Sequence, residues 1–222
     1  MQNQGVRILR NGVIQIRNRK MRKSKAELFQ NLAIEAQSCQ ICEAMRDKIA
    51  VLSEQNGNIN PKVMFIAEAP GRQGADRTRK PFSGDKSGAN FDRFLASINL
   101  RRDELFITNA VLCSPRKESG ANRSPKKSEI KNCSNFLNRT IELINPKIIV
   151  TLGRVALEAL QAIEYHQFEL QKDVGKILSW NHRLLVPLYH PSPQVLASHR
   201  RENEQFKDYK VLAKAIRQVS IS

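Results

Sequence analysis

Short apolar runs alternate with longer amphipathic stretches along most of the chain. The short runs predict four strands, at residues 63–67, 105–108, 148–152 and 184–186. Apolar residues recur at helical spacing between and after these runs, over residues 91–98, 130–144, 154–163 and 206–216. Ser24 and Glu27 have the spacing of a capping box, which predicts one more helix that leads toward Cys39.

This order of elements predicts an α/β fold. Strands that alternate with helices usually form a parallel sheet that is covered on both faces. We therefore expect a three-layer α/β/α fold with a central, mainly parallel four-stranded sheet, in one domain over residues 26–222. A chain of 222 residues suits one such domain. Ligands of these folds bind beyond the carboxyl ends of the strands, so the candidate chemistry is sought there.

The charge of the chain indicates a polyanionic partner. Lys and Arg number 37 against 21 Asp and Glu, which gives a formal net charge of +16 and favours nucleic acid. Residues 1–25 contain eight basic residues and no acidic one, and predict a basic N-terminal arm. No apolar run reaches the roughly 18 residues that a membrane span needs. We expect a monomer in the cytoplasm with no membrane partner, associated with the nucleoid if the source is bacterial or archaeal.

The loop after the first strand contains residues that could bind a ligand or take part in catalysis. Glu68-Ala69-Pro70-Gly71 follows the strand directly, and a glycine-rich stretch through Asp76, Phe82 and Asp85 leads to the next helix. Glycines in such a loop allow a ligand to approach the backbone, and a helix start offers free N–H groups. Glycine-rich loops are common, so this signal alone is weak.

The second and fourth strands end in polar residues as well. Asn109 follows the second strand, and the segment His190-Pro191-Ser192-Pro193 follows the fourth. The predicted topology would bring an acid pair, an amide, an imidazole and an aromatic ring to one edge of the sheet. Such a gathering of groups is typical of a catalytic pocket.

Taken together and in order, these motifs resemble the uracil-DNA glycosylase superfamily, and specifically its iron–sulfur families 4 and 5, over about residues 36–216. The stretch from Ala69-Pro70 to Gly88 is similar to the first motif of family 5, although Asp76 stands where that motif usually has Asn. Glu68 and Asn109 resemble family 4 instead. His190-Pro191-Ser192-Pro193 resembles the second motif of the superfamily, whose His faces the base and whose following loop enters the minor groove.

The resemblance implies a monofunctional DNA glycosylase that flips uracil out of DNA and hydrolyses its bond to the sugar in base-excision repair. The family 5 likeness raises other deaminated bases as further substrates. Cleavage of this bond builds negative charge on the base and positive charge on the sugar. His190 is the candidate for a hydrogen bond to the base's carbonyl oxygen. Asp85 resembles the family 5 carboxylate that positions water, and Glu68 holds the family 4 acidic position; both are candidate catalytic residues.

The remaining motif residues are candidates for binding. Asn109 would read the uracil edge and Phe82 would stack on the ring, beside the loop residues Ala69, Pro70, Gly71 and Asp76. Ser192, Pro193, Gln194 and Val195 would contact DNA, one of residues 194–196 would fill the vacated stack, and Arg200 would contact phosphate. The loop from Arg116 to Lys131 is basic, and its Asn122 resembles a family 5 site residue.

Four cysteines form a candidate metal site. Cys39 and Cys42 make a Cys-x-x-Cys pair, while Cys113 and Cys133 stand far along the chain. Zinc ribbons usually have two close pairs, and four thiolates suit either zinc or a 4Fe–4S cluster. The resemblance favours the cluster, in a structural role, with zinc as the less favoured occupant.

Each candidate residue also has an ordinary structural explanation. His190 could cap a turn, Asp85 could form an Asx turn, Asn109 could end a strand and Phe82 could pack in the core. Glu68 could pair with a nearby Arg. The alternative function is a non-catalytic metal-containing module that binds nucleic acid. A nucleotide-handling enzyme is weakened by the absence of a Gly-Lys-Ser/Thr phosphate loop.

Overall fold

The computed structural model describes residues 6–8, 14–16 and 23–221. The predicted basic arm therefore lies largely outside the described residues. Within it, β1 (Val6–Ile8) and β2 (Ile14–Ile16) form an antiparallel pair. Lys25, which we counted in the arm, begins α1 (Lys25–Gln37), and its ammonium donates to the carbonyl of Ile144 over 2.9 Å.

A five-stranded sheet forms the centre of the fold, in the order β4-β3-β5-β7-β6. Four strands are parallel: β3 (Val63–Ala67), β4 (Leu105–Asn109), β5 (Ile148–Leu152) and β7 (Arg183–Leu188). The predicted α/β class and the four predicted strands are confirmed. The predicted number of strands is wrong, because β6 (Leu178–Trp180) pairs antiparallel with β7.

The additional strand depends on a tight turn rather than on a hydrophobic pattern. It has three residues, too few to show alternation, and it lies at the edge of the sheet. Asn181 and His182 join it to β7 with φ angles of 46° and 58°. Positive φ at both central residues is the geometry of a type I′ turn, which favours Asn at the first position. Asn181 was the one local signal for this hairpin.

Helices cover both faces of the sheet. The longer ones, besides α1, are α3 (Lys86–Ala96), α4 (Lys127–Ile144) and α8 (Glu202–Ile221). The short α-helices are α2 (Ala75–Thr78), α5 (Arg154–Ala159), α6 (Leu170–Asp173) and α7 (Pro193–Ser198). Short 3₁₀ turns are η1 (Glu43–Met45), η2 (Glu54–Asn56), η3 (Arg102–Glu104) and η4 (Leu160–Ala162). The predicted capping box at Ser24 and Glu27 begins α1, as expected.

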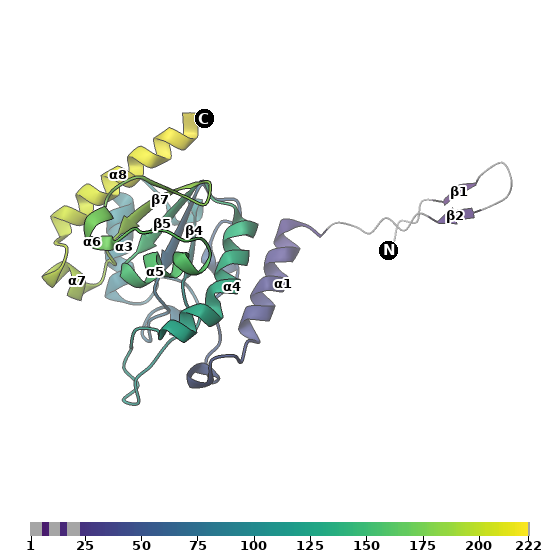
Figure 1. The fold of residues 1–222 in the computed structure, drawn as a ribbon, viewed down its shortest axis with the longest axis horizontal. Coiled ribbons are helices and arrows are strands. Elements are labelled where there is room, and N and C mark those ends of the chain that lie inside the picture. The colour runs from purple at the N-terminus through teal and green to yellow at the C-terminus, as the bar shows by residue number, and fades with distance from the viewer. Residues whose placement is uncertain (1–5, 9–13, 17–22, 222) are drawn as a thin grey trace.

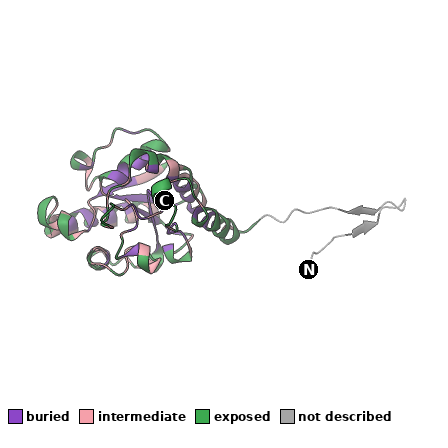
Figure 2. Cartoon of the chain, turned by 90° about the horizontal axis from the view of Figure 1, so that it is seen from below, coloured by how far each residue is buried: buried purple, intermediate pink, exposed green. Residues whose placement is uncertain are grey.

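The core has two layers because side chains alternate across the sheet. In β3, Met64 and Ile66 face the layer that contains α1, α4 and α5, whereas Phe65 packs against α3 and α8. Every residue of β3, β4 and β5 is buried, as Figure 2 shows for the strands at the centre. The sheet therefore presents only its edges and strand ends to ligands.

No helix in the described part of the chain is long and apolar enough to cross a membrane.

Candidate active site

One cavity of about 780 Å³ lies at the carboxyl ends of β3, β4 and β7. Most residues that the sequence singled out for catalysis and binding line it: Glu68, Ala69, Pro70, Gly71, Phe82, Asp85, Asn109, His190, Ser192, Pro193, Gln194 and Val195. An adjoining cavity of about 980 Å³ shares Glu68, His190 and Val195 with it, and Lys127 and Arg154 line that second cavity. The structure therefore brings the expected groups together, whereas their roles stay predictions.

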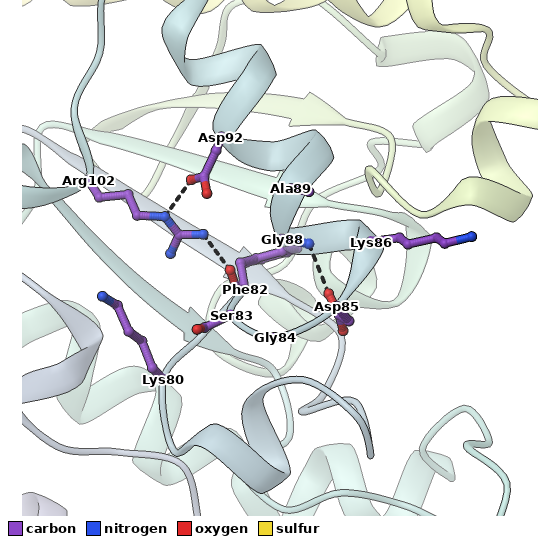
Figure 3. A pocket seen from close by; sticks show the side chains of 10 residues that line it. All are labelled: Lys80, Phe82, Ser83, Gly84, Asp85, Lys86, Gly88, Ala89, Asp92 and Arg102. Carbon is purple, nitrogen blue, oxygen red and sulfur yellow. Dashed lines mark hydrogen bonds and ion pairs between the residues drawn. The ribbon is translucent and has the colours of Figure 1, made fainter.

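Asp85 has a structural contact and a cavity position at once. It is the N-cap of α3, and its Oδ1 accepts the Gly88 N–H over 2.9 Å, as Figure 3 shows. Its Oδ2 faces the backbone of the opposite loop, because a Cβ on Gly74 would lie 2.3 Å from this oxygen. A side chain at Gly74 would displace the carboxylate, so the glycine is required by close approach. Capping orients Asp85 without removing it from the cavity.

His190 follows β7 and is partly buried in the cavity wall. Its ring centroid lies 5.5 Å from that of Phe82, with the planes tilted by 34°. Burial lowers the pKa of His190 from 6.5 to about 4, although the Asp85 carboxylate acts in the opposite direction. The imidazole is therefore neutral near pH 7, and a neutral imidazole donates one hydrogen bond.

Asn109 ends β4 inside the cavity and is only 5% exposed. Its Nδ2 is buried and has no hydrogen-bond partner among the described residues. A buried amide without a partner is unfavourable, and natural structures usually satisfy it with water or a ligand. Phe82 forms another part of the wall, and its ring stacks on Phe91 with centroids 4.6 Å apart. The cavity thus offers one unsatisfied donor and one aromatic face.

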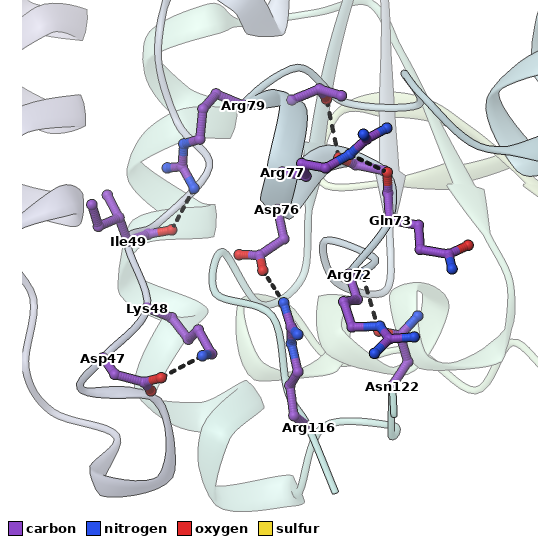
Figure 4. A network of polar contacts seen from close by, with 12 residues as sticks. Asp47, Lys48, Ile49, Arg72, Gln73, Asp76, Arg77, Arg79, Arg116 and Asn122 are labelled. Atoms are coloured by element: carbon purple, nitrogen blue, oxygen red, sulfur yellow. Dashed lines mark hydrogen bonds and ion pairs between the residues drawn. The ribbon is translucent and has the colours of Figure 1, made fainter. Parts of the chain in front are cut away.

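Asp76 does not line this cavity, although the sequence placed it among the substrate-binding residues. Its carboxylate accepts from the Arg116 guanidinium, which comes from the basic loop before α4 (Figure 4). Asn122 of the same loop accepts the Arg72 N–H over 3.0 Å and lines the cavity. Two loops far apart in sequence are therefore joined at the cavity rim. Asp76 joins α2 to the basic loop, and its substrate-binding role stays a prediction.

Arg123 is a cavity residue that the sequence marked only as part of a basic loop. Its guanidinium forms two hydrogen bonds to the Glu129 carboxylate, over 2.7 and 2.6 Å, and Glu129 is 4% exposed. Glu129 also accepts the Lys126 N–H at the start of α4. Nothing in the sequence indicated the buried ion pair.

The segment after His190 begins a short helix at the cavity mouth. Ser192 caps α7, with its Oγ accepting the Val195 N–H over 3.4 Å, and Pro193 occupies the first turn. Arg200 beyond it lies away from the cavity lining. Its guanidinium donates to both oxygens of Asp208, over 3.0 and 2.7 Å, and Asp208 is 5% exposed. The sequence-based role of Arg200 as a phosphate contact therefore competes with an internal ion pair.

The four cysteines are brought close to one another from α1's end, β4's end and α4. Burial, and then the neighbouring thiols of Cys133, Cys39 and Cys42, raise the pKa of Cys113 to about 12. The amide of Asn132 donates to the Cys42 sulfur over 3.3 Å. Among the described residues, no group of three or more His, Cys, Asp or Glu side chains is placed to hold a single metal ion. The four thiols are thus neighbours, but they are not arranged as a mononuclear site.

Comparison with known proteins agrees with this geometry. The family model described as the uracil DNA glycosylase superfamily matches residues 54–214. The chain belongs to the uracil-DNA glycosylase superfamily. The matched residues include the whole cavity lining, Cys113 and Cys133, whereas Cys39 and Cys42 lie before them.

Relatives of two types match the chain, in line with its mixed motifs. The type-4 uracil-DNA glycosylase of Saccharolobus solfataricus is 39% identical over 72% of this chain and 74% of that protein. The type-4 enzyme of Archaeoglobus fulgidus is 31% identical over 83% and 91% of the two chains. A type-5 uracil-DNA glycosylase of Pyrobaculum aerophilum is 32% identical over 62% and 64%. The resemblance stated from the motifs is confirmed.

Replacing Arg200 by Ala should lower stability more than it lowers DNA affinity. The change leaves the buried Asp208 carboxylate without its main partner. We expect a loss of about 2 kcal/mol in the free energy of unfolding, less than for a fully buried pair because Arg200 keeps some contact with water. Urea unfolding and DNA titration measure the two effects. The matched control is Arg201→Ala, because that residue is exposed. If Arg200→Ala weakened DNA binding and left the free energy of unfolding unchanged, the result would favour the predicted role of Arg200 as a phosphate contact.

His190 should make stability fall as the pH drops. Its folded pKa of about 4 lies below the ordinary value of 6.5, so the unfolded chain takes up the proton first. The stabilisation is complete above pH 6.5 and is lost toward pH 4, by at most about 1.4 kcal/mol per pH unit. Urea unfolding across this range should show a shallower decline for His190→Gln. His166, whose pKa burial also lowers, is present in both proteins and cancels. Equal slopes would contradict the buried neutral state.

Proposed function

We propose that this protein is a monofunctional DNA glycosylase that flips uracil out of DNA and hydrolyses its bond to deoxyribose, as a step of base-excision repair. The single observation that carries the proposal is the shared cavity, which holds an amide, an imidazole, an aromatic ring and two carboxyl groups. Membership of the superfamily and the printed names of the relatives support the same substrate.

Recognition of uracil is assigned to Asn109 and Phe82. The Asn109 amide offers a donor to O4 and an acceptor to N3–H, and its Nδ2 lacks a partner within the described chain. Cytosine has a donor where uracil has O4, so it would leave the Asn109 donor unpaired. The Phe82 ring gives the extruded base a stacking surface.

Bond cleavage is assigned to His190 and the two carboxylates. The neutral imidazole donates to the carbonyl oxygen that gains negative charge as the base departs. Asp85, held by the Gly88 N–H, orients the attacking water and stabilises positive charge on the sugar, and the Glu68 carboxylate at the carboxyl end of β3 adds to this negative charge. Because the Gly88 N–H already orients the Asp85 carboxylate, this side chain does not have to change its conformation when the reaction begins.

Access to the cavity requires the nucleotide to leave the duplex. Extrusion costs a few kcal/mol and is easiest for a mispaired base, so uracil opposite guanine is the favoured substrate over uracil opposite adenine. Ser192, Pro193, Gln194 and Val195 lie at the cavity mouth, where one side chain fills the vacated stack. Lys127 and Arg154 in the adjoining cavity are in position to meet the flanking backbone.

We also propose that Cys39, Cys42, Cys113 and Cys133 hold a 4Fe–4S cluster. Four cysteine thiolates are the ligand set of such a cluster, and the thiols of Cys39, Cys42 and Cys133 are close enough to Cys113 to raise its pKa. When bound, the cluster supplies a cross-link among α1, the end of β4 and α4. Cys113 is two residues beyond Val111, whose N–H donates to Glu68's carbonyl over 3.0 Å, so this cross-link would steady the cavity wall.

Conversion of both carboxylates to amides should abolish uracil release and spare DNA binding. In Asp85→Asn with Glu68→Gln, we expect the rate to fall roughly 10³-fold or more, because the sugar cation loses its stabilising charge. Asn at position 85 keeps the cap of α3. Release is measured on a duplex with one uracil opposite guanine, and binding by fluorescence anisotropy.

The control carries Asp103→Asn with Glu118→Gln, which removes two exposed carboxylates that do not line the cavity. Full activity of the Asp85 and Glu68 double variant would contradict the assigned roles. A wild-type protein that binds DNA and releases no base would instead support the non-catalytic alternative.

Cys113→Ser should remove the cluster. The purified wild-type protein is expected to be brown and to contain iron, and the variant should lose both its visible absorbance and its iron. Ser114→Ala is the matched control, since it alters the adjacent residue and keeps all four thiols. Elemental analysis distinguishes the occupants. A colourless wild-type protein that contains zinc would contradict the cluster.

A further inference from the structure

The backbone of Phe82 has an unusual conformation at the wall of the active-site cavity. Its φ is +50°, in the left-handed region that bulky side chains rarely adopt. The ring nevertheless lies between Phe91 and His190, with centroids 4.6 and 5.5 Å away. Such backbone strain persists only where the surroundings enforce it. The contacts that enforce it therefore control where the ring stands.

Arg102 supplies these contacts from outside the cavity. It belongs to η3, before β4, and its guanidinium donates to the carbonyl of Phe82 (Figure 3). The guanidinium also donates to the carbonyl of Pro81 over 3.0 Å. Its Nε donates to the Asp92 carboxylate on α3, and its guanidinium carbon lies 5.3 Å from the centre of the Phe91 ring. Only arginine has a rigid fork that can make all of these contacts at once.

The other side of the Phe82 carbonyl is closed by α3. A Cβ on Gly88 would lie 2.3 Å from this oxygen, so the carbonyl is held between a helix that permits no side chain there and the Arg102 guanidinium. Three residues later the same loop supplies Asp85, the cap of α3. Arg102 thus restrains the loop that carries both the ring and the carboxylate. Arg102 does not line the 780 Å³ active-site cavity, although it lines an adjoining cavity of about 640 Å³ together with Phe82 and Asp85 (Figure 3).

We propose that Arg102 is a positioning residue, which holds Phe82 in its left-handed conformation and so keeps the ring in place to stack on the extruded base. This inference rests on the proposed function. Arg102 lies outside the motifs at 68–88 and 190–193, and it contacts the reaction only through the backbone of Phe82.

The test compares Arg102→Met with Arg101→Met in single-turnover reactions at saturating enzyme. Arg101 is the adjacent residue, carries the same charge, and its guanidinium donates to the exposed Asp103. We expect Arg102→Met to slow uracil release roughly tenfold to a hundredfold, as for other misplaced reacting groups. Affinity for uracil-free DNA should be the same in both variants. Arg102→Lys, which keeps the charge and loses the fork, should restore only part of the rate.

A double-mutant cycle separates positioning from a general loss of stability. If Arg102 acts through the ring, Arg102→Met should change the rate little in a Phe82→Leu background. The inference would be overturned if the Arg102→Met and Phe82→Leu substitutions together slowed uracil release by the product of their separate effects. Equal rates for Arg102→Met and Arg101→Met would overturn it as well. If Arg102→Met does not fold, Arg102→Lys takes its place in both comparisons. A wild-type protein that releases no uracil is a different result, because it refutes the proposed function itself.

Discussion

The parallel registration of β3, β4, β5 and β7 is the constraint on which the site depends. Ala67 is paired with Asn109 and Leu152 with Leu188, so neighbouring strands end at the same level. The polypeptide leaves the sheet there with Glu68, Asn109 and His190, which are far apart in sequence. Burial of both faces keeps the strands in this register, since a shift of one residue would turn apolar side chains of β3 from one core layer to the other.

Several residues that line the cavity also have structural contacts. Asp85 caps α3 instead of forming only the Asx turn that was its ordinary structural explanation, and the same hydrogen bond orients its carboxylate in the cavity. Burial that would disfavour a charged His190 keeps its imidazole neutral, the state suited to donate to a departing base. Asn109 illustrates the opposite case, because its buried Nδ2 has no hydrogen-bond partner among the described residues. The fold stabilises the first two and leaves the third unsatisfied.

A count of basic residues overstates the charge that can meet DNA. Arg102, Arg116, Arg123 and Arg200 are all bound to carboxylates, of Asp92, Asp76, Glu129 and Asp208 respectively. These pairs join elements within the molecule, for example the loop of α2 to the loop before α4. These four arginines are therefore engaged within the molecule, and other basic residues remain to attract a polyanion. Sequence composition indicated the class of partner but not the residues that would meet it.

The sequence by itself determined the elements whose signal is local: strand β3 from its apolar run, α4 from its helical period, α1 from its capping box, and the cavity loops from motifs of fixed order. Tertiary structure alone decided which side chains became partners. The three residues of β6 form a strand only because β7 lies beside them, and Asp76 forms an ion pair with Arg116, which is 40 positions away in the sequence. Arg102 acquired its position from Phe82 and Asp92 in the same way. Such pairings join residues whose spacing has no period, so only the folded chain could establish them.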